Sequence, residues 1–207
     1  MRPNLILSRL FATVLAMLAT VGYVSAEPYS KIRFVPIPSD ILPSSEVRKL
    51  YQDSDGYIWI PTYNGLARYD GYGVVTYDMH DVSGVAFNSF VNVVAEDRDK
   101  AIWIGTERGL FRLDKKTGMI STTGCEQVGD CNISVIICDT GNGIWVGSDK
   151  GLFRKNASEH DFRPVTMRNA DGKPVTDITS VVKDANCSLW IASYGSGLLR
   201  YDLREER

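Results

Sequence analysis

The stretch AIWIGTERGLFRLD, residues 101–114, decides the fold of this chain. Two short apolar runs, AIWIGT and LFRLD, flank the polar turn Glu107-Arg108-Gly109, as they do in a β-hairpin. Successive side chains of a strand point to opposite faces, so the Ile-Trp-Ile run without alternation predicts a strand covered on both faces. The stretch therefore predicts a strand pair inside a stack of sheets.

The same pattern occurs four times. Each copy has a tryptophan, an aspartate six residues before it, and a glycine-leucine pair after it, and successive tryptophans are 42 to 45 residues apart. The tryptophans are Trp59, Trp103, Trp145 and Trp190; the aspartates are Asp53, Asp97, Asp139 and Asp184; the glycines are Gly65, Gly109, Gly151 and Gly197. A repeat of this length predicts a solenoid, a propeller or an array. Sustained 3.6-residue periodicity with helix caps is absent from the repeats, which excludes helical repeats.

The expected fold is all-β, made of β-propeller blades in four antiparallel four-stranded repeats. We expect the blades at residues 44–79, 89–123, 132–167 and 177–203, with a final blade that reaches only its third strand. The tryptophans are predicted to pack between blades, and carbohydrate stacking is the alternative role. The aspartates and glycines are expected to be structural, in turns.

Residues 27–43 form an N-terminal segment that contains an extended stretch, Lys31–Ile37. If this stretch pairs beside Leu198–Leu203, it closes a small four-bladed ring. Otherwise the chain is a partial propeller, which is the preferred interpretation. Its open apolar flanks would then favour self-association or a partner chain.

Composition narrows the function classes. The chain has 207 residues, a formal net charge of −2 and two histidines. Without a lysine- and arginine-rich run, nucleic acid is not an expected partner, and two histidines argue against a histidine-rich metal centre. Residues 1–26 have the charges, apolar run and Val24-Ser25-Ala26 ending of a signal peptide, with an uncleaved anchor as the alternative. The product is therefore expected to be periplasmic or secreted, with no membrane span in the mature chain.

Export changes the interpretation of the four cysteines. Cys125 and Cys131 are six residues apart in a glycine-containing loop, and an oxidising compartment favours a local disulfide between them. The paired spacing of a zinc site does not occur. The state of Cys138 and Cys187 stays open.

The residues of the first two copies resemble a known family. DSDGYIWIPT at 53–62 with GLARYDG at 65–71, and EDRDKAIWIGT at 96–106 with GLFRLD at 109–114, are similar to two-component-regulator propeller repeats. The resemblance implies the periplasmic sensor region of a hybrid two-component or diguanylate-cyclase receptor, in a short or truncated member without its own output domain. It also implies a small extracellular ligand such as a carbohydrate. Pro61 and Ala192 stand where the pattern has glycine.

Polar turn tips vary between the copies and are expected to share one rim with the blade-to-blade loops. Variable tips on a constant scaffold are where binding specificity normally lies, and solvated turns without a ligand are the alternative. The candidate ligand-binding residues are Tyr63, Asn64, Glu107, Arg108, Asp149, Lys150, Tyr194 and Ser196.

Three functions remain. The preferred one is a non-enzymatic exported sensor or ligand-binding module, with no cofactor, no metal and no catalytic residues. The second is a propeller lyase or hydrolase acting on a glycan or lactone, for which His80 would have to lie near Glu107 or Asp149. The third is an interaction scaffold.

Asp53-Ser-Asp-Gly resembles the start of a calcium loop, but the downstream ligands are missing, so a turn is expected.

Overall fold

The computed structural model describes residues 34–77, 90–122, 124–139 and 143–204. The chain divides into two compact units, Met1–Ile37 and Pro38–Arg207. The predicted signal peptide, residues 1–26, lies outside the described residues. No helix in the described ranges is long and apolar enough to cross a membrane.

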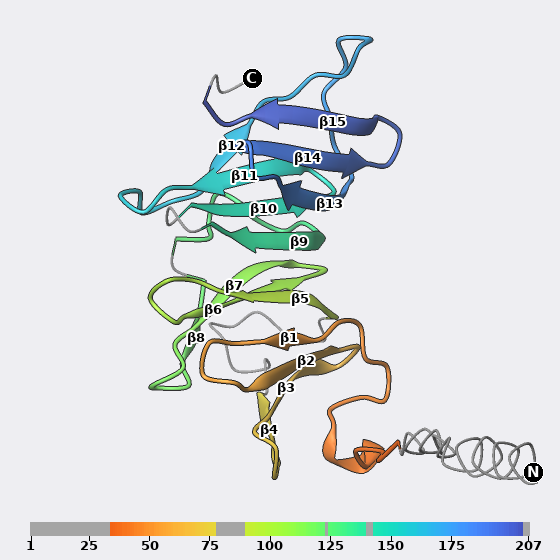
Figure 1. The fold of residues 1–207 in the computed structure, drawn as a ribbon, viewed down its shortest axis with the longest axis vertical. Helices are drawn as coiled ribbons and strands as arrows, with labels where there is room; N and C mark the ends of the chain where they lie inside the picture. The colour runs from red at the N-terminus through yellow and green to blue at the C-terminus, as the bar shows by residue number, and fades with distance from the viewer. Residues whose placement is uncertain (1–33, 78–89, 123, 140–142, 205–207) are drawn as a thin grey trace, which may run out of the picture. The chain divides into compact units, whose positions relative to one another are not determined.

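The second unit is built almost entirely from strands, in four antiparallel sheets that follow the repeats in chain order (Figure 1). A 3-10 helix, η1 (Ser39–Ile41), precedes them. Sheet 1 holds β1 (Tyr51–Gln52), β2 (Ile58–Thr62), β3 (Gly65–Tyr69) and β4 (Val74–Tyr77). Sheet 2 holds β5 (Val91–Glu96), β6 (Ile102–Thr106), β7 (Gly109–Leu113) and β8 (Ile120–Ser121). Sheet 3 holds β9 (Ile133–Cys138), β10 (Ile144–Ser148), β11 (Gly151–Lys155) and β12 (Arg163–Val165). Sheet 4 holds β13 (Ile178–Lys183), β14 (Ser188–Ser193) and β15 (Gly197–Asp202).

These sheets confirm the predicted all-β fold of propeller blades. Among the described residues sheet 4 has three strands, as expected for a final blade that reaches only its third strand. The segment expected to complete it is described only at Phe34–Ile37, which forms no strand and is exposed. Sheets 1 and 4 stand at opposite ends of the series (Figure 1), and no apolar cluster of the described residues joins them. The described strands are therefore a partial propeller and not a closed four-bladed ring.

Three apolar clusters form the core, one at each seam between successive sheets. Trp59 of sheet 1 packs with Ile102 and Ile104 of sheet 2. Trp103 of sheet 2 packs with sheet 3, and Trp145 of sheet 3 packs with sheet 4. These three indoles are at most 2% exposed. Trp190 differs, because no described sheet comes after sheet 4, and it is 40% exposed.

The repeated aspartate ties the turn before β2, β6 and β14 to the indole on that strand. One carboxylate oxygen accepts backbone N–H bonds inside the turn, and the other accepts the indole Nε1–H. The indole bonds are 2.8 Å for Trp59 to Asp53, 2.8 Å for Trp103 to Asp97 and 3.1 Å for Trp190 to Asp184. Asp139 caps the same turn of sheet 3 with a 2.7 Å backbone bond from its N–H to the Gly143 carbonyl. The turn and the seam are thus one structural unit.

The predicted Cys125–Cys131 disulfide is not formed. Cys131 is a free thiol that donates to the Val128 carbonyl at 3.4 Å. A tight turn, in which the Val128 N–H donates to the Cys125 carbonyl at 3.0 Å, directs both side chains into the seam between sheets 2 and 3. Burial there raises the pKa of the Cys125 thiol to about 12.

Candidate functional site

The hairpin tips between the second and third strands of sheets 1 to 3 are each held by a buried hydroxyl. The Thr62, Thr106 and Ser148 side chains accept the N–H two residues on and donate to the glycine carbonyl three residues on. The glycines at the ends of the tips, Gly65, Gly109, Gly151 and Gly197, have φ of +116°, +120°, +124° and +73°. These values lie in the region that glycine adopts without a steric cost. The tip backbone is therefore fixed, while its side chains project outward.

The sequence-predicted tip residues all lie on this rim. Tyr63, Asn64, Glu107, Arg108, Asp149, Lys150 and Tyr194 are exposed, and Ser196 is half-buried. Each tip is bonded to the segment that enters the inner strand of the same sheet. The Glu107 N–H donates to the Phe90 carbonyl at 3.2 Å, and the Asp149 N–H donates to the Asn132 carbonyl at 3.1 Å. Tips and entry segments thus form one edge of each sheet, as expected from the sequence.

Contacts across the seams join neighbouring tips. The Tyr63 ring of sheet 1 lies edge-on to Phe90, which enters sheet 2, with the ring planes at 84°. The Asp177 N–H, at the entry to sheet 4, donates to the Asp149 carbonyl of sheet 3 at 3.0 Å. Lys150 donates to the Asp130 carbonyl, in the segment that enters its own sheet. The rim is therefore joined across the seam between sheets 1 and 2 and across the seam between sheets 3 and 4.

A polar pocket of about 300 Å³ opens among the inner strands of sheets 1 to 3. Its lining residues are Arg48, Lys49, Asn92, Glu107, Asn132 and Ser134. Lys49 Nζ donates to the Ser134 carbonyl at 3.2 Å, and Asn92 Nδ2 donates to Asn132 Oδ1 at 2.8 Å. The pocket thus offers two cations, one carboxylate and two side-chain amides to a ligand.

A β-bulge brings some of these side chains into the pocket. Strand β5 shifts register between Val91 and Val93, which leaves Asn92 as the extra residue. Strand β9 has a similar shift opposite Gly147 and Ser148, next to Ser134, and β13 has one between Ile178 and Ser180. Bulges re-aim a side chain at barrel rims and beside sites.

Sequence reasoning identified Glu107 of this pocket and missed the rest. The other predicted tip residues do not line it. The signal that could have located two of the missed residues is a polar residue within an otherwise apolar inner strand. Asn92 in VNVVAE and Ser134 in ISVIIC fit this description. Arg48 and Lys49 precede β1 and carry no comparable pattern.

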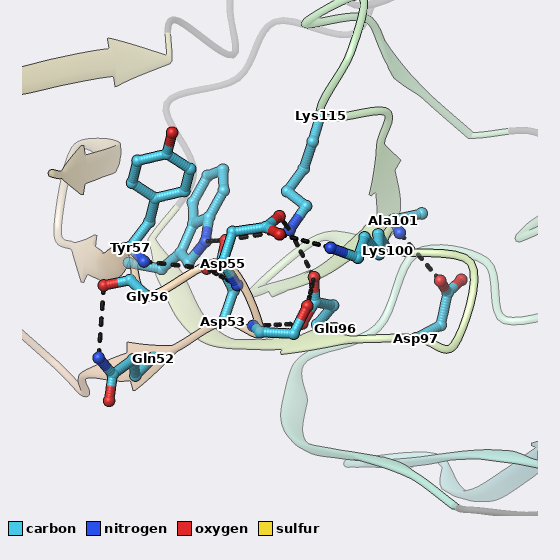
Figure 2. Close-up of polar contacts among 12 residues, drawn as sticks. Gln52, Asp53, Asp55, Gly56, Tyr57, Glu96, Asp97, Lys100, Ala101 and Lys115 are labelled. Atoms are coloured by element: carbon cyan, nitrogen blue, oxygen red, sulfur yellow. Dashed lines mark hydrogen bonds and ion pairs between the residues drawn. The ribbon is translucent and has the colours of Figure 1, made fainter.

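At the opposite ends of the strands, five charged side chains from sheets 1 and 2 meet (Figure 2), and Lys100 among them pairs with Asp55. Lys115 Nζ lies 3.1 Å from Asp53 Oδ2 and 2.6 Å from Asp55 Oδ2, and it also bonds Glu96. The side chains of Lys115, Asp53 and Glu96 are 9%, 0% and 6% exposed. The three carboxylates are close enough together to share a cation, and the Lys115 ammonium supplies one.

These contacts change the acidity of the cluster. Burial alone would raise the pKa of Asp53, but hydrogen bonds from Trp59 and Lys115 hold it below its ordinary value. Hydrogen bonds from Lys100 and Lys115 lower the pKa of Asp55 to about 2. The Asp53–Gly56 segment forms the expected turn, since Asp53 Oδ1 accepts the N–H groups of Asp55 and Tyr57, both at 3.0 Å. The cluster therefore joins two sheets electrostatically.

The histidine that the structure describes, His160, does not line this pocket. His80, the residue that an enzyme would need beside Glu107 or Asp149, lies outside the described residues. His160 has a side chain 73% exposed, with Nδ1 lying 2.9 Å from Asp161 Oδ1. It lines a different pocket, between sheets 2 and 3.

Comparisons with known proteins agree with the repeats. The family model described as "Two component regulator propeller" matches residues 41–64 and 86–108. A search of curated protein sequences finds no match. The fold is similar to the extracellular domain of BT4673 from B. thetaiotaomicron, described as a hybrid two component system. In that comparison the TM-score is 0.65 and the identity 24%, over 77% of this chain and 22% of that one.

Two further solved structures share the fold. The extracellular domain of BT3049 from the same organism, also described as a hybrid two component system, has a TM-score of 0.62 and 18% identity, over 83% of this chain and 23% of that one. Virginiamycin B lyase from Staphylococcus aureus has a TM-score of 0.52 and 16% identity, over 81% and 58%. The chain thus spans less than a quarter of the two extracellular domains.

Proposed function

We propose that this chain, which carries two-component regulator propeller repeats, is a non-enzymatic exported sensor module that binds a small polar ligand on its rim. The repeats support a sensor-type propeller, because the family model and the similar extracellular domains both come from two-component proteins. The ligand and its site are inferred from this chain's own residues.

The observation that carries the proposal is the polar pocket at the inner strands. Sequence-distant residues from three sheets line it, among them Lys49, Asn92 and Ser134, each brought there by its own repeat. Such convergent polar groups on a rigid scaffold are typical of small-molecule sites. Two cations against one carboxylate favour a hydroxylated ligand that bears an anionic group, because charge-assisted hydrogen bonds are the strong ones.

Carbohydrate is the ligand class that the family resemblance implies. A sugar acid combines hydroxyls for Asn92 and Asn132 with a carboxylate for Arg48 and Lys49. Exposed aromatic rings on the same rim would contact the flat face of a sugar, and the Tyr63 and Tyr194 side chains are 46% and 84% exposed. We therefore assign the anionic end of the ligand to the pocket and its sugar faces to the tips.

Calorimetric titration with neutral and acidic oligosaccharides tests the proposal. Acidic oligosaccharides should bind more tightly than their neutral counterparts. Lys49→Ala and Asn92→Ala should each weaken binding at least about tenfold, while Lys116→Ala, an exposed cation of the other rim, should leave it unchanged. Tyr63→Ala, Arg108→Ala and Tyr194→Ala test the tips in the same way.

If none of these variants changes the affinity for the oligosaccharide, the proposed site is rejected. The alternative enzyme function has one observation in its favour, the shared fold of virginiamycin B lyase. Product analysis after prolonged incubation with the bound oligosaccharide separates the two functions, since a sensor module returns the ligand intact.

A further inference from the structure

Sheet 4 exposes a face that the other three sheets bury. In sheets 1 to 3 this face, here called the trailing face, packs on the next sheet through the repeated tryptophan and the leucine of the third strand. The leucines Leu66, Leu110 and Leu152 are 0%, 2% and 1% exposed. At the equivalent places in sheet 4, Leu198 is 67% and Trp190 is 40% exposed. Val182, paired with Trp190 in the register, is 59% exposed.

Sheet 1 leaves uncovered part of the opposite face, here called the leading face. In sheets 2 to 4 this face presents two branched residues three positions apart on the inner strand. The pairs are Val91 with Val94, Ile133 with Ile136, and Ile178 with Val181, and none of them exceeds 6% exposure. The register of sheet 1 puts Val47 opposite Thr62, as Val91 lies opposite Thr106. Val47 and Leu50 form the corresponding pair and are 44% and 67% exposed.

The residue sizes at the internal seams are complementary. A Cβ on Gly105 would lie 2.5 Å from Ile133 Cγ2, and one on Gly147 would lie 2.6 Å from Ile178 Cγ2, so isoleucine requires glycine opposite it. The first seam has Pro61 in the glycine position, and the smaller Val91 stands in the isoleucine position. At the exposed ends, Ala192 stands in the glycine position of sheet 4 and Val47 in the isoleucine position of sheet 1.

We propose that these two exposed faces bind each other between copies, so that the trailing face of one chain receives the leading face of a second. Leu198 and Trp190 of one copy then contact Val47 and Leu50 of the other, as Leu66 and Trp59 contact Val91 and Val94 within the chain. The first seam already accommodates a residue with a Cβ, Pro61, opposite Val91, so Ala192 opposite Val47 has a precedent within the chain. The occupant is a second copy because the chain itself presents both halves of the seam.

The contact is heterologous, since the two faces differ. Such an interface continues until a ring closes, or forms an open filament if the rotation does not close. Each additional copy covers one trailing and one leading face. Indole and leucine side chains of this kind are typical centres of an interface, where truncation costs most of the affinity.

Sedimentation velocity of the exported full chain tests the proposal. The wild type should sediment as a dimer or larger species at micromolar concentration. Leu198→Asp, which blocks the trailing face, and Leu50→Asp, which blocks the leading face, should each weaken association at least about tenfold. Both side chains are exposed within one chain, so the melting temperature of the isolated protomer should be preserved. Tyr72→Asp is the matched control, because Tyr72 is 100% exposed and on neither face.

Mixing the two blocked variants gives the decisive result. One Leu198→Asp chain and one Leu50→Asp chain retain a single intact pair of faces between them, so the mixture should associate although neither variant does alone. Acrylamide quenching of Trp190 should fall as the wild type associates. A monomeric wild type overturns the proposal. It is the result expected if further repeats of a longer polypeptide cover sheet 4. Variants that associate normally, or a mixture that stays monomeric, also overturn it.

Discussion

The indole Nε1–H of Trp103 donates a 2.8 Å hydrogen bond to Oδ2 of Asp97, six residues earlier in the chain. The other carboxylate oxygen, Oδ1, accepts the Ala101 N–H at 2.9 Å. One side chain therefore closes the turn before β6 and also satisfies the polar end of a side chain that is 1% exposed. This double role explains why aspartate recurs with tryptophan in sheets 1, 2 and 4.

Asp97→Ala should destabilise the protein by about 1 to 3 kcal/mol, because it leaves a buried indole N–H without an acceptor. Asp97→Asn retains an acceptor and should cost less. Asp99→Ala is the matched control, since Asp99 is an exposed residue of the same turn. Urea unfolding measures all three. Equal midpoints for Asp97→Ala and Asp99→Ala would show that the indole bond does not stabilise the seam.

The sequence predicted those features that every repeat shares. Tryptophan, aspartate and glycine recur because each seam and each tip needs the same residue, so the four sheets and the rim could be inferred. The bulge at Asn92 was missed, because an extra residue breaks the two-residue alternation on which strand prediction depends. The exposure of Trp190 depends on whether another sheet packs against sheet 4, and a repeat pattern alone does not contain that information.

The Lys115 cluster was missed for a different reason. Lys115 and Asp53 are 62 positions apart and meet only once sheets 1 and 2 have packed.

Removing the ammonium with Lys115→Ala leaves Asp53 and Glu96 buried as unpaired carboxylates. We expect a loss of about 3 to 5 kcal/mol. Lys116→Ala, next to it and exposed, should have little effect. A loss below about 1 kcal/mol in urea unfolding, the size of an exposed ion pair, would contradict a stabilising role for the cluster.

The same cluster should make stability depend on acid. The pKa of Asp53 and the pKa of Asp55 are lowered in the folded protein from an ordinary value of 3.8, that of Asp55 to about 2. A carboxylate whose pKa is lowered in the folded protein stabilises that protein. The contribution is complete when the pH is above the ordinary pKa, and it is lost as the pH falls through the lower pKa of the folded state. The difference in unfolding free energy between wild type and Lys115→Ala should therefore shrink between about pH 4 and pH 2. Urea unfolding at intervals across this range measures it, and a constant difference would refute the assignment.

Gly147 marks the closest approach between sheets 3 and 4. A Cβ there would lie 2.6 Å from Ile178 Cγ2 and 2.6 Å from Val135 Cγ1. Gly147→Ala should destabilise by about 1 to 3 kcal/mol through overpacking. Gly73→Ala is the control, since nothing lies within 4 Å of its added Cβ. Ile178→Ala removes the Cγ2 methyl group at the contact, so Gly147→Ala should cost less in an Ile178→Ala background than in the wild type. Independent effects of the two changes in thermal unfolding would contradict this packing.

Replacing Cys187 with glycine should stabilise the folded protein, whereas most substitutions destabilise it. Cys187 has φ of +63°, at the place where the equivalent turn of sheet 1 has Gly56 with φ of +91°. Non-glycine residues pay a steric cost in this conformation, whereas glycine does not. The backbone bond from the Leu203 N–H to the Cys187 carbonyl, 3.0 Å, does not depend on the side chain. Cys187→Gly should therefore raise the unfolding free energy by about 0.5 to 1 kcal/mol, offset in part by the greater freedom of glycine in the unfolded chain. Cys187→Ala keeps a Cβ and should give no gain. If both variants shift the urea midpoint equally, loss of the thiol and not relief of the backbone accounts for the change.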